Sequence, residues 1–162
     1  MISYRCKKNN LKVIIENKAY EKIIDIVRDI NNIETGGIII GYYNVALTEA
    51  IITSVTSQPS DSKAGFSWFV RGIQGLKDLL ISKWKIDSEY YLGEWHYHPI
   101  GSALPSNVDI SQIRKISKDK RFNCPEPILL IVSNRIIDWE ISVTIMKNNL
   151  VYHLSKEGHL DD

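Results

Sequence analysis

The sequence predicts a mixed α/β (α+β) fold, with a mostly antiparallel sheet flanked by helices. Strand-length apolar runs rich in β-branched residues recur along the chain. Segments with apolar residues at helical spacing lie between them. The composition, 44% hydrophobic and 24% charged, is ordinary for a globular protein. Because no repeat and no Pro- or Gly-rich linker divides the 162 residues, we expect one domain over residues 1–162.

The first half of the chain predicts strands on either side of a helix. Residues 11–15 form a β-branched run, and residues 17–30 carry apolar side chains at helical spacing behind a possible cap at Asn17. Residues 38–43 predict a strand buried on both faces, and residues 46–55 predict its partner. The polar stretch 56–66 then reads as a loop.

The second half predicts two more helices and four or five strands. A short strand over 66–70 precedes a helix whose buried stripe should comprise Ile73, Leu76, Leu79, Leu80 and Trp84. A strand over 90–95 is followed by a third helix that starts near Ser106 and should turn Val108, Ile113 and Ile116 inward. The last three strands are expected at 128–133, 139–146 and 150–154. The order in which the strands pair does not follow from the sequence.

Charge and cysteine content narrow the classes of function. With 20 basic and 19 acidic residues the net charge is +1, so we expect neither nucleic acid nor a membrane as the partner. Cys6 and Cys124 are too few for a disulfide framework and favour a reducing compartment. The N-terminus lacks the apolar stretch of a signal peptide, and the longest apolar runs are too short to span a bilayer. We therefore expect a cytoplasmic protein.

Two histidines and one aspartate predict a metal site. His96 and His98 are two residues apart at the end of a predicted strand, so their side chains point to the same face. Pro99 then ends the strand, and ten residues separate His98 from Asp109 at the start of the next helix. Three nitrogen or oxygen ligands with a fourth position open for water are what a catalytic Zn²⁺ requires. We therefore predict Zn²⁺ on His96, His98 and Asp109.

The same residues also have interpretations that need no metal. Asp109 follows Ser106 by three residues, which is the spacing of a capping box at a helix start. His96 and His98 could be a hydrogen-bonded pair at a strand end. A hydrolase would also need a group that moves protons, and Glu94 shares the histidines' face only if the strand stays regular.

At this point the sequence resembles the JAMM/MPN+ (JAB-domain) metalloproteases. The matching residues are Glu34, Gly36-Gly37, His96, His98, Pro99, Pro105, Ser106 and Asp109. The resemblance implies a single MPN/JAB-like domain with Zn²⁺ on the three predicted ligands. It also implies that Glu34 is the general acid/base and that Ser106 steadies the oxyanion of the tetrahedral intermediate.

More narrowly, residues 91–99 resemble the compact prokaryotic branch, which includes the deconjugating peptidases of bacterial CBASS antiphage operons. This implies an isopeptidase whose substrate is a protein with an extended C-terminal tail joined to an amine, with E1- and E2-like and nucleotidyltransferase proteins as partners. Three alternatives remain open: a zinc hydrolase that processes a sulfur-carrier protein or a small amide metabolite, a non-catalytic MPN scaffold, and a metal-dependent nuclease, against which the near-neutral charge argues.

Overall fold

Eight strands form a closed barrel in the computed structural model of the protein, which describes residues 1–30, 32–134 and 138–158. In the order in which they neighbour one another, the strands are β1 (Ile2–Cys6), β10 (Leu150–Lys156), β9 (Trp139–Lys147), β8 (Ile128–Asn134), β7 (Tyr90–His98), β3 (Thr35–Tyr43), β4 (Glu49–Val55) and β2 (Leu11–Ile15). The β2–β4 and β7–β8 pairs are parallel, and the other neighbouring pairs are antiparallel. The predicted mixed, mostly antiparallel sheet is confirmed. Strand β1, which the sequence pattern does not predict, closes the barrel by pairing with both β2 and β10.

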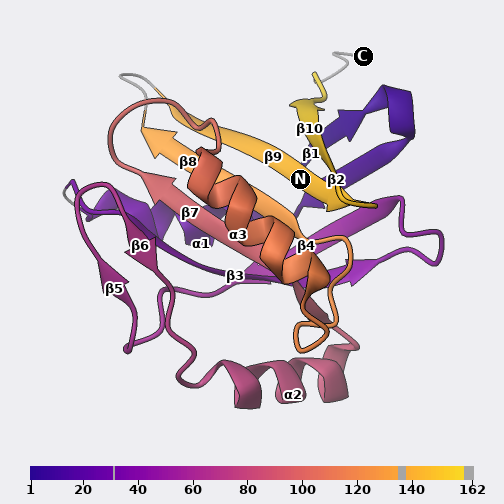
Figure 1. The fold of residues 1–162 in the computed structure, drawn as a ribbon, viewed down its shortest axis with the longest axis horizontal. Helices are drawn as coiled ribbons and strands as arrows, with labels where there is room; N and C mark the ends of the chain where they lie inside the picture. The colour runs from indigo at the N-terminus through magenta and orange to yellow at the C-terminus, as the bar shows by residue number, and fades with distance from the viewer. Residues whose placement is uncertain (31, 135–137, 159–162) are drawn as a thin grey trace.

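Three α-helices lie where the periodicity predicts them: α1 (Asn17–Arg28), α2 (Leu76–Asp87) and α3 (Asn107–Lys118). Figure 1 shows α3 lying across β7, β8 and β9, with α1 behind the sheet and α2 below it. A short 3-10 helix, η1 (Lys7–Asn9), joins β1 to β2. In the described part of the chain, no helix has both the length and the apolar character needed to cross a bilayer.

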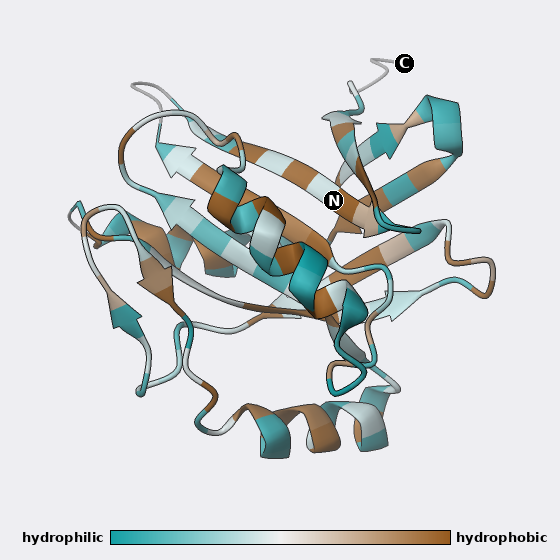
Figure 2. Ribbon diagram, viewed as in Figure 1, coloured by the Kyte–Doolittle hydropathy of each residue, from teal (hydrophilic) through white to brown (hydrophobic). Residues whose placement is uncertain are grey.

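The core is divided between the two faces of the sheet. The largest cluster joins one face to α1, through Ile23 and Val27 of the helix and the fully buried Trp95 of β7. On the opposite face, Ile38 lies in a cluster with residues of α2, and Ile131 lies in a cluster with residues of α3. The alternating colours along the strands in Figure 2 reflect this division, because successive side chains of a strand point to opposite faces.

Two expectations about the helix faces are wrong. The predicted buried stripe of α2 is only partly covered, since Ile73 is 73% and Trp84 59% accessible. Only one narrow row of the helix packs on the sheet, and it consists of Leu76, Leu79 and Leu80. In α3, Val108 is exposed, whereas Ile113 and Ile116 are buried as predicted. The first turn of α3 directs Asp109 rather than Val108 inward.

A small hairpin occupies the segment that the sequence predicted as a loop and a short strand. Its strands, β5 (Lys63–Ala64) and β6 (Phe69–Val70), pair with each other and not with the barrel. Figure 1 shows the hairpin standing apart from the sheet, between the level of α3 and that of α2. In the chain, the hairpin belongs to the connection between β4 and α2.

Candidate functional site

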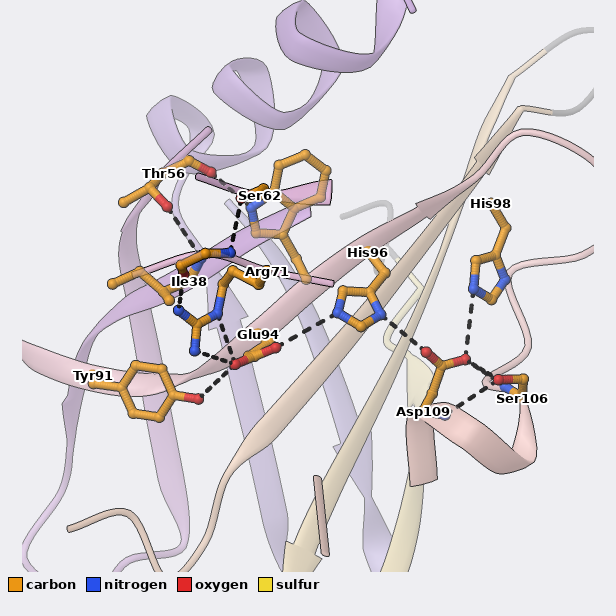
Figure 3. Close-up of polar contacts among 12 residues, drawn as sticks. Ile38, Thr56, Ser62, Arg71, Tyr91, Glu94, His96, His98, Ser106 and Asp109 are labelled. Atoms are coloured by element: carbon orange, nitrogen blue, oxygen red, sulfur yellow. Dashed lines mark hydrogen bonds and ion pairs between the residues drawn. The ribbon is translucent and has the colours of Figure 1, made fainter. Parts of the chain in front are cut away.

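The candidate site is built on the C-terminal half of β7. The register between β3 and β7 shifts between Ile39 and Ile40, next to Gly93. Gly93 has φ of +147°, and a Cβ atom there would lie 1.9 Å from the carbonyl oxygen of Ile128. This irregularity places Tyr91 on the same face as Glu94, whose carboxylate accepts a hydrogen bond of 3.3 Å from the Tyr91 hydroxyl. From Glu94 onward the strand is regular, so Glu94, His96 and His98 share one face, as Figure 3 shows.

The neighbouring strand leaves room for the His96 ring. Gly36 of β3 pairs with His96, and a Cβ atom at Gly36 would lie 2.2 Å from the Trp95 carbonyl oxygen and 2.9 Å from His96 Cδ2. Phe69 of β6 packs edge-on against the imidazole, with 5.5 Å between ring centroids. His96 is therefore enclosed on several sides and is only 4% exposed.

Asp109 completes the cluster from the first turn of α3. Its Oδ1 lies 2.9 Å from His96 Nδ1, and its Oδ2 lies 3.5 Å from His98 Nε2 (Figure 3). The capping box is present as well: the Asp109 N–H donates to Ser106 Oγ at 3.2 Å, and Asp109 Oδ2 accepts from the Ser106 N–H at 2.7 Å. The two interpretations of the sequence are thus not exclusive, because the cap holds the carboxylate in front of the imidazoles.

The charges of the cluster reinforce one another. Burial alone would raise the pKa of Asp109, but the hydrogen bonds with His96 and Ser106 outweigh burial and lower the pKa to about 2. Burial alone would lower the pKa of His96, but its contacts with Asp109 and Glu94 raise it to about 9. Asp109 and Glu94 thus both favour the charged form of the His96 ring.

Glu34 lies beside the cluster, directly before β3. Its backbone N–H donates to the carbonyl of Gly65 in the β5–β6 hairpin at 3.0 Å, and its side chain is half-buried. Burial raises the pKa of Glu34, and the charges of His98, Asp109 and His96 also act on it. In the described part of the chain, its carboxylate makes no direct hydrogen bond with the histidines. Glu34 is thus within electrostatic range of the cluster but not tied to it.

Sequence reasoning missed Arg71, which binds Glu94. Both Nε and Nη2 of Arg71 reach Glu94 Oε1, at 2.9 and 2.8 Å, while Glu94 Oε2 lies 3.6 Å from His96 Nε2. Burial alone would raise the pKa of Glu94, but its contacts with His96 and Arg71 lower it. Arg71 follows the β5–β6 hairpin and carries no sequence signal of its role, because only the folded path of this loop brings it to β7.

Cavity size does not locate the candidate site. A cavity of about 520 Å³ lies between α2, the start of β7 and the connection from α3 to β8, and aromatic side chains such as Trp84 and Phe122 line it. The cavity that His96 and Asp109 line is only about 10 Å³. The candidate site is therefore defined by its chemistry and not by a large pocket.

The donor set suits zinc, although the described residues hold no group of three or more His, Cys, Asp or Glu side chains already arranged around an ion position. Two imidazoles and one carboxylate are common ligands of catalytic Zn²⁺. Two atoms that each lie about 2.1 Å from a tetrahedral ion are about 3.4 Å apart. The 3.5 Å from His98 Nε2 to Asp109 Oδ2 is close to that value, whereas the 2.9 Å from His96 Nδ1 to Asp109 Oδ1 is that of a hydrogen bond. The three residues therefore fit the metal by donor type.

Comparison with known proteins agrees with the fold and the motif. Residues 16–142 match the family described as prokaryotic homologs of the JAB domain. A protein of Enterobacter hormaechei subsp. hoffmannii (strain UCI 50), named CD-NTase/cGAS isopeptidase, is 38% identical over 120 residues. These residues cover 74% of this chain and 66% of that relative, so the chain spans just under two thirds of the relative's length.

Among solved structures, the chain is similar to the solution structure of protein DSY2949 from Desulfitobacterium hafniense. The TM-score is 0.60 at 17% identity, over 87% of this chain and 88% of the other. At this identity the likeness shows a shared fold alone. The family match spans more than half of the chain, and the protein therefore belongs to the prokaryotic JAB-domain family. The resemblance seen in the sequence is confirmed.

Proposed function

We propose that this protein is a zinc-dependent isopeptidase that cleaves the bond between the C-terminus of one protein and an amine of another. The observation that carries the proposal is the meeting of His96, His98 and Asp109 at N–O distances of 2.9 and 3.5 Å. Two of these residues come from β7 and the third from α3, and the fold of a JAB-domain family member brings them together.

The conjugated protein is inferred from the relative. Because the Enterobacter protein is named CD-NTase/cGAS isopeptidase, we infer that the substrate is a nucleotidyltransferase of that class, joined through its extended C-terminal tail to an amine. E1- and E2-like enzymes would form the bond, and this protein would reverse their action in cytoplasmic antiphage defence. Because the barrel is closed, strand addition of the tail would take place at the β5–β6 hairpin, whose strands pair only with each other.

The mechanism assigns a separate task to each residue. When bound, Zn²⁺ would polarise the scissile carbonyl and activate a water molecule. His96, His98 and Asp109 would hold the ion, and Glu34 would take the proton of the attacking water and pass it to the departing amine. The pKa of Glu34 is raised, which suits this exchange, because a general acid/base works best when its pKa is near the pH of the reaction.

Ser106 would donate a hydrogen bond to the oxyanion of the tetrahedral intermediate. In the structure its hydroxyl donates to Asp109 Oδ2 at 2.6 Å. If that carboxylate oxygen binds an ion, the hydroxyl can turn toward the substrate while the backbone half of the capping box still holds Asp109. The capping residue would thus serve both the helix and the reaction.

The proposal is tested by measuring zinc content and cleavage together. The purified protein, His96→Ala and a control, His153→Ala, are analysed for bound zinc and incubated with a nucleotidyltransferase tail fused to an amine-bearing protein. His153 is exposed on β10 and bonds Thr144, away from the site. We expect intact-mass spectrometry to show cleavage by the wild type and by His153→Ala, and loss of both zinc and cleavage in His96→Ala.

Other outcomes would favour the alternative functions. Zinc binding without cleavage of the fusion, but with release of a tail from a sulfur-carrier protein or hydrolysis of a small amide, would indicate a different zinc hydrolase. Absence of zinc in the wild type, even after incubation with the ion, would indicate a non-catalytic scaffold and overturn the proposal.

A further inference from the structure

We propose that Arg71 and Glu94 form a positioning pair that fixes the orientation of the His96 ring and thereby strengthens metal binding. The inference rests on the proposed zinc-dependent function. It concerns two residues that do not belong to the predicted ligand set.

The His96 ring lies between two carboxylates. Its Nδ1 lies 2.9 Å from Asp109 Oδ1, and its Nε2 lies 3.6 Å from Glu94 Oε2. A carboxylate facing the N–H of one ring nitrogen sets the tautomer, so that the lone pair of the other nitrogen is available to a ligand. Glu94 thus faces the ring nitrogen opposite to the one at the predicted metal position (Figure 3).

The two oxygens of Glu94 have different partners. Oε1 accepts from both Nε and Nη2 of Arg71 and from the Tyr91 hydroxyl, which leaves Oε2 facing His96. The side chains of Arg71 and Glu94 are only 10% and 11% exposed. A buried carboxylate needs such compensation to stay ionised. Arg71 therefore fixes both the charge and the direction of the carboxylate that faces the imidazole.

Arg71 is itself anchored in the segment that follows the β5–β6 hairpin. Its Nη1 donates to the Gly72 carbonyl at 2.7 Å, and the Gly72 N–H donates to Ser62 Oγ at 2.9 Å. Phe69 of β6 packs against the same His96 ring. The hairpin therefore contacts His96 directly through the Phe69 ring. The turn after it acts on His96 indirectly, through the contact of Arg71 with Glu94.

A purely structural role is the alternative explanation for the pair. Buried ion pairs contribute little net stability on average, because desolvation offsets their attraction. Stability measurements alone therefore cannot separate the two roles. Metal affinity and the geometry of a bound ion do separate them, since only a positioning role changes these quantities in a folded variant.

The experiment compares Glu94→Gln, Arg71→Met, Arg71→Lys and the double variant Arg71→Met/Glu94→Gln. The double variant leaves no unpaired buried charge and so retains the fold even where a single variant does not. Zn²⁺ affinity is measured by competition with a chromophoric chelator, and the visible spectrum of the Co²⁺-loaded protein reports coordination geometry. Arg5→Met/Glu157→Gln, which removes an ion pair of 2.6 Å next to the β1–β10 pair and away from β7 in the strand order, is the control.

We expect the double variant to bind Zn²⁺ about 10–100-fold more weakly than the wild type, with an altered Co²⁺ spectrum. The Zn²⁺ affinity of Arg71→Lys should lie between those of the wild type and the double variant, because an ammonium keeps the charge but cannot donate from two nitrogens as the guanidinium does. The control should match the wild type. A folded double variant with Zn²⁺ affinity within about twofold of wild type, and an unchanged spectrum, would overturn the inference.

His96→Ala separates this failure from failure of the proposed function. If His96→Ala loses Zn²⁺ while the double variant keeps it, only the positioning role is refuted. If His96→Ala also binds Zn²⁺ as the wild type does, His96 is not a ligand and both proposals fail.

Discussion

Gly36 lies opposite His96 in the pairing of β3 with β7, and a methyl group on Gly36 would lie 2.9 Å from Cδ2 of the His96 ring. The same methyl group would lie 2.2 Å from the backbone oxygen of Trp95. Because the second contact is with backbone, no side-chain rotation relieves it. The position thus links the packing of two strands directly to the placement of a predicted metal ligand.

Replacing Gly36 with alanine should therefore damage stability and metal binding together. The strands must separate locally, and we expect a loss of about 3 kcal/mol in the free energy of unfolding. We also expect weaker Zn²⁺ binding, because His96 moves with the strand. Urea unfolding and a chelator competition measure the two effects. The control is Gly158→Ala, since a Cβ atom there meets no atom within 4 Å. Normal Zn²⁺ affinity in a destabilised Gly36→Ala protein would show that this contact does not place the ring.

Replacing Ser106 with alanine should have two effects of different size. Loss of the N-cap should cost about 1 kcal/mol of stability. Loss of an oxyanion donor should lower kcat by about 10²–10³-fold. Thermal unfolding measures the loss of stability, and steady-state kinetics on the same preparation measure the fall in kcat. Ser111→Ala, on the exposed face of the same helix, should change neither quantity. A stability loss without a fall in kcat would mean that Ser106 only caps the helix.

The meeting of His96, His98 and Asp109 could be predicted from sequence because each part of the cluster is local. The two-residue spacing of His96 and His98 fixes their common face, Pro99 ends the strand, and Ser106 marks the helix start that carries Asp109. The contribution of Arg71 could not be predicted. It depends on how the turn after β6 returns to β7, and no spacing in the sequence encodes that return.

The fold shows the same division between local and non-local information. Strands such as β3 and β8 are continuous apolar runs and were predicted, whereas β1 mixes Ser3 and Arg5 with apolar residues and was not. Closure of the barrel could not be predicted, because it depends on β1 pairing with β10 at the other end of the chain. The exposed side chains of α2 show that helical spacing marks a helix without showing how much of it is covered.

Glu89 should make the stability of the protein depend on pH in the acid range. Burial alone would raise the pKa of Glu89, but the hydrogen bonds from Thr53 and Lys83, the latter at 2.9 Å, outweigh burial and lower it from its ordinary 4.5. A lowered pKa in the folded state contributes stability that is fully present above pH 4.5 and is lost as the pH falls through the folded-state pKa.

The difference in unfolding free energy between the wild type and Glu89→Gln should therefore be constant above about pH 5 and shrink below it. Urea unfolding at several pH values measures this difference. Glu21→Gln, at an exposed position of α1, should show no such trend. A difference that stays constant down to pH 3, about 1.5 units below the ordinary glutamate pKa, would refute the assignment.

Glu34→Gln should separate metal binding from proton transfer. The amide keeps the shape of the side chain but cannot accept a proton, so we expect cleavage of the conjugate to slow by about 10²–10⁴-fold. Zinc content should stay at the wild-type level, because among the described residues the Glu34 carboxylate makes no hydrogen bond or ion pair with Asp109 or the imidazoles. Glu21→Gln again serves as the control and should cleave normally. Turnover of Glu34→Gln at the wild-type rate would exclude Glu34 as the general base and leave Glu94 as the carboxylate nearest to the imidazoles after Asp109. In that case the buried ion pair with Arg71 would have to open during turnover, since Glu94 cannot both receive a proton and keep its charge for Arg71.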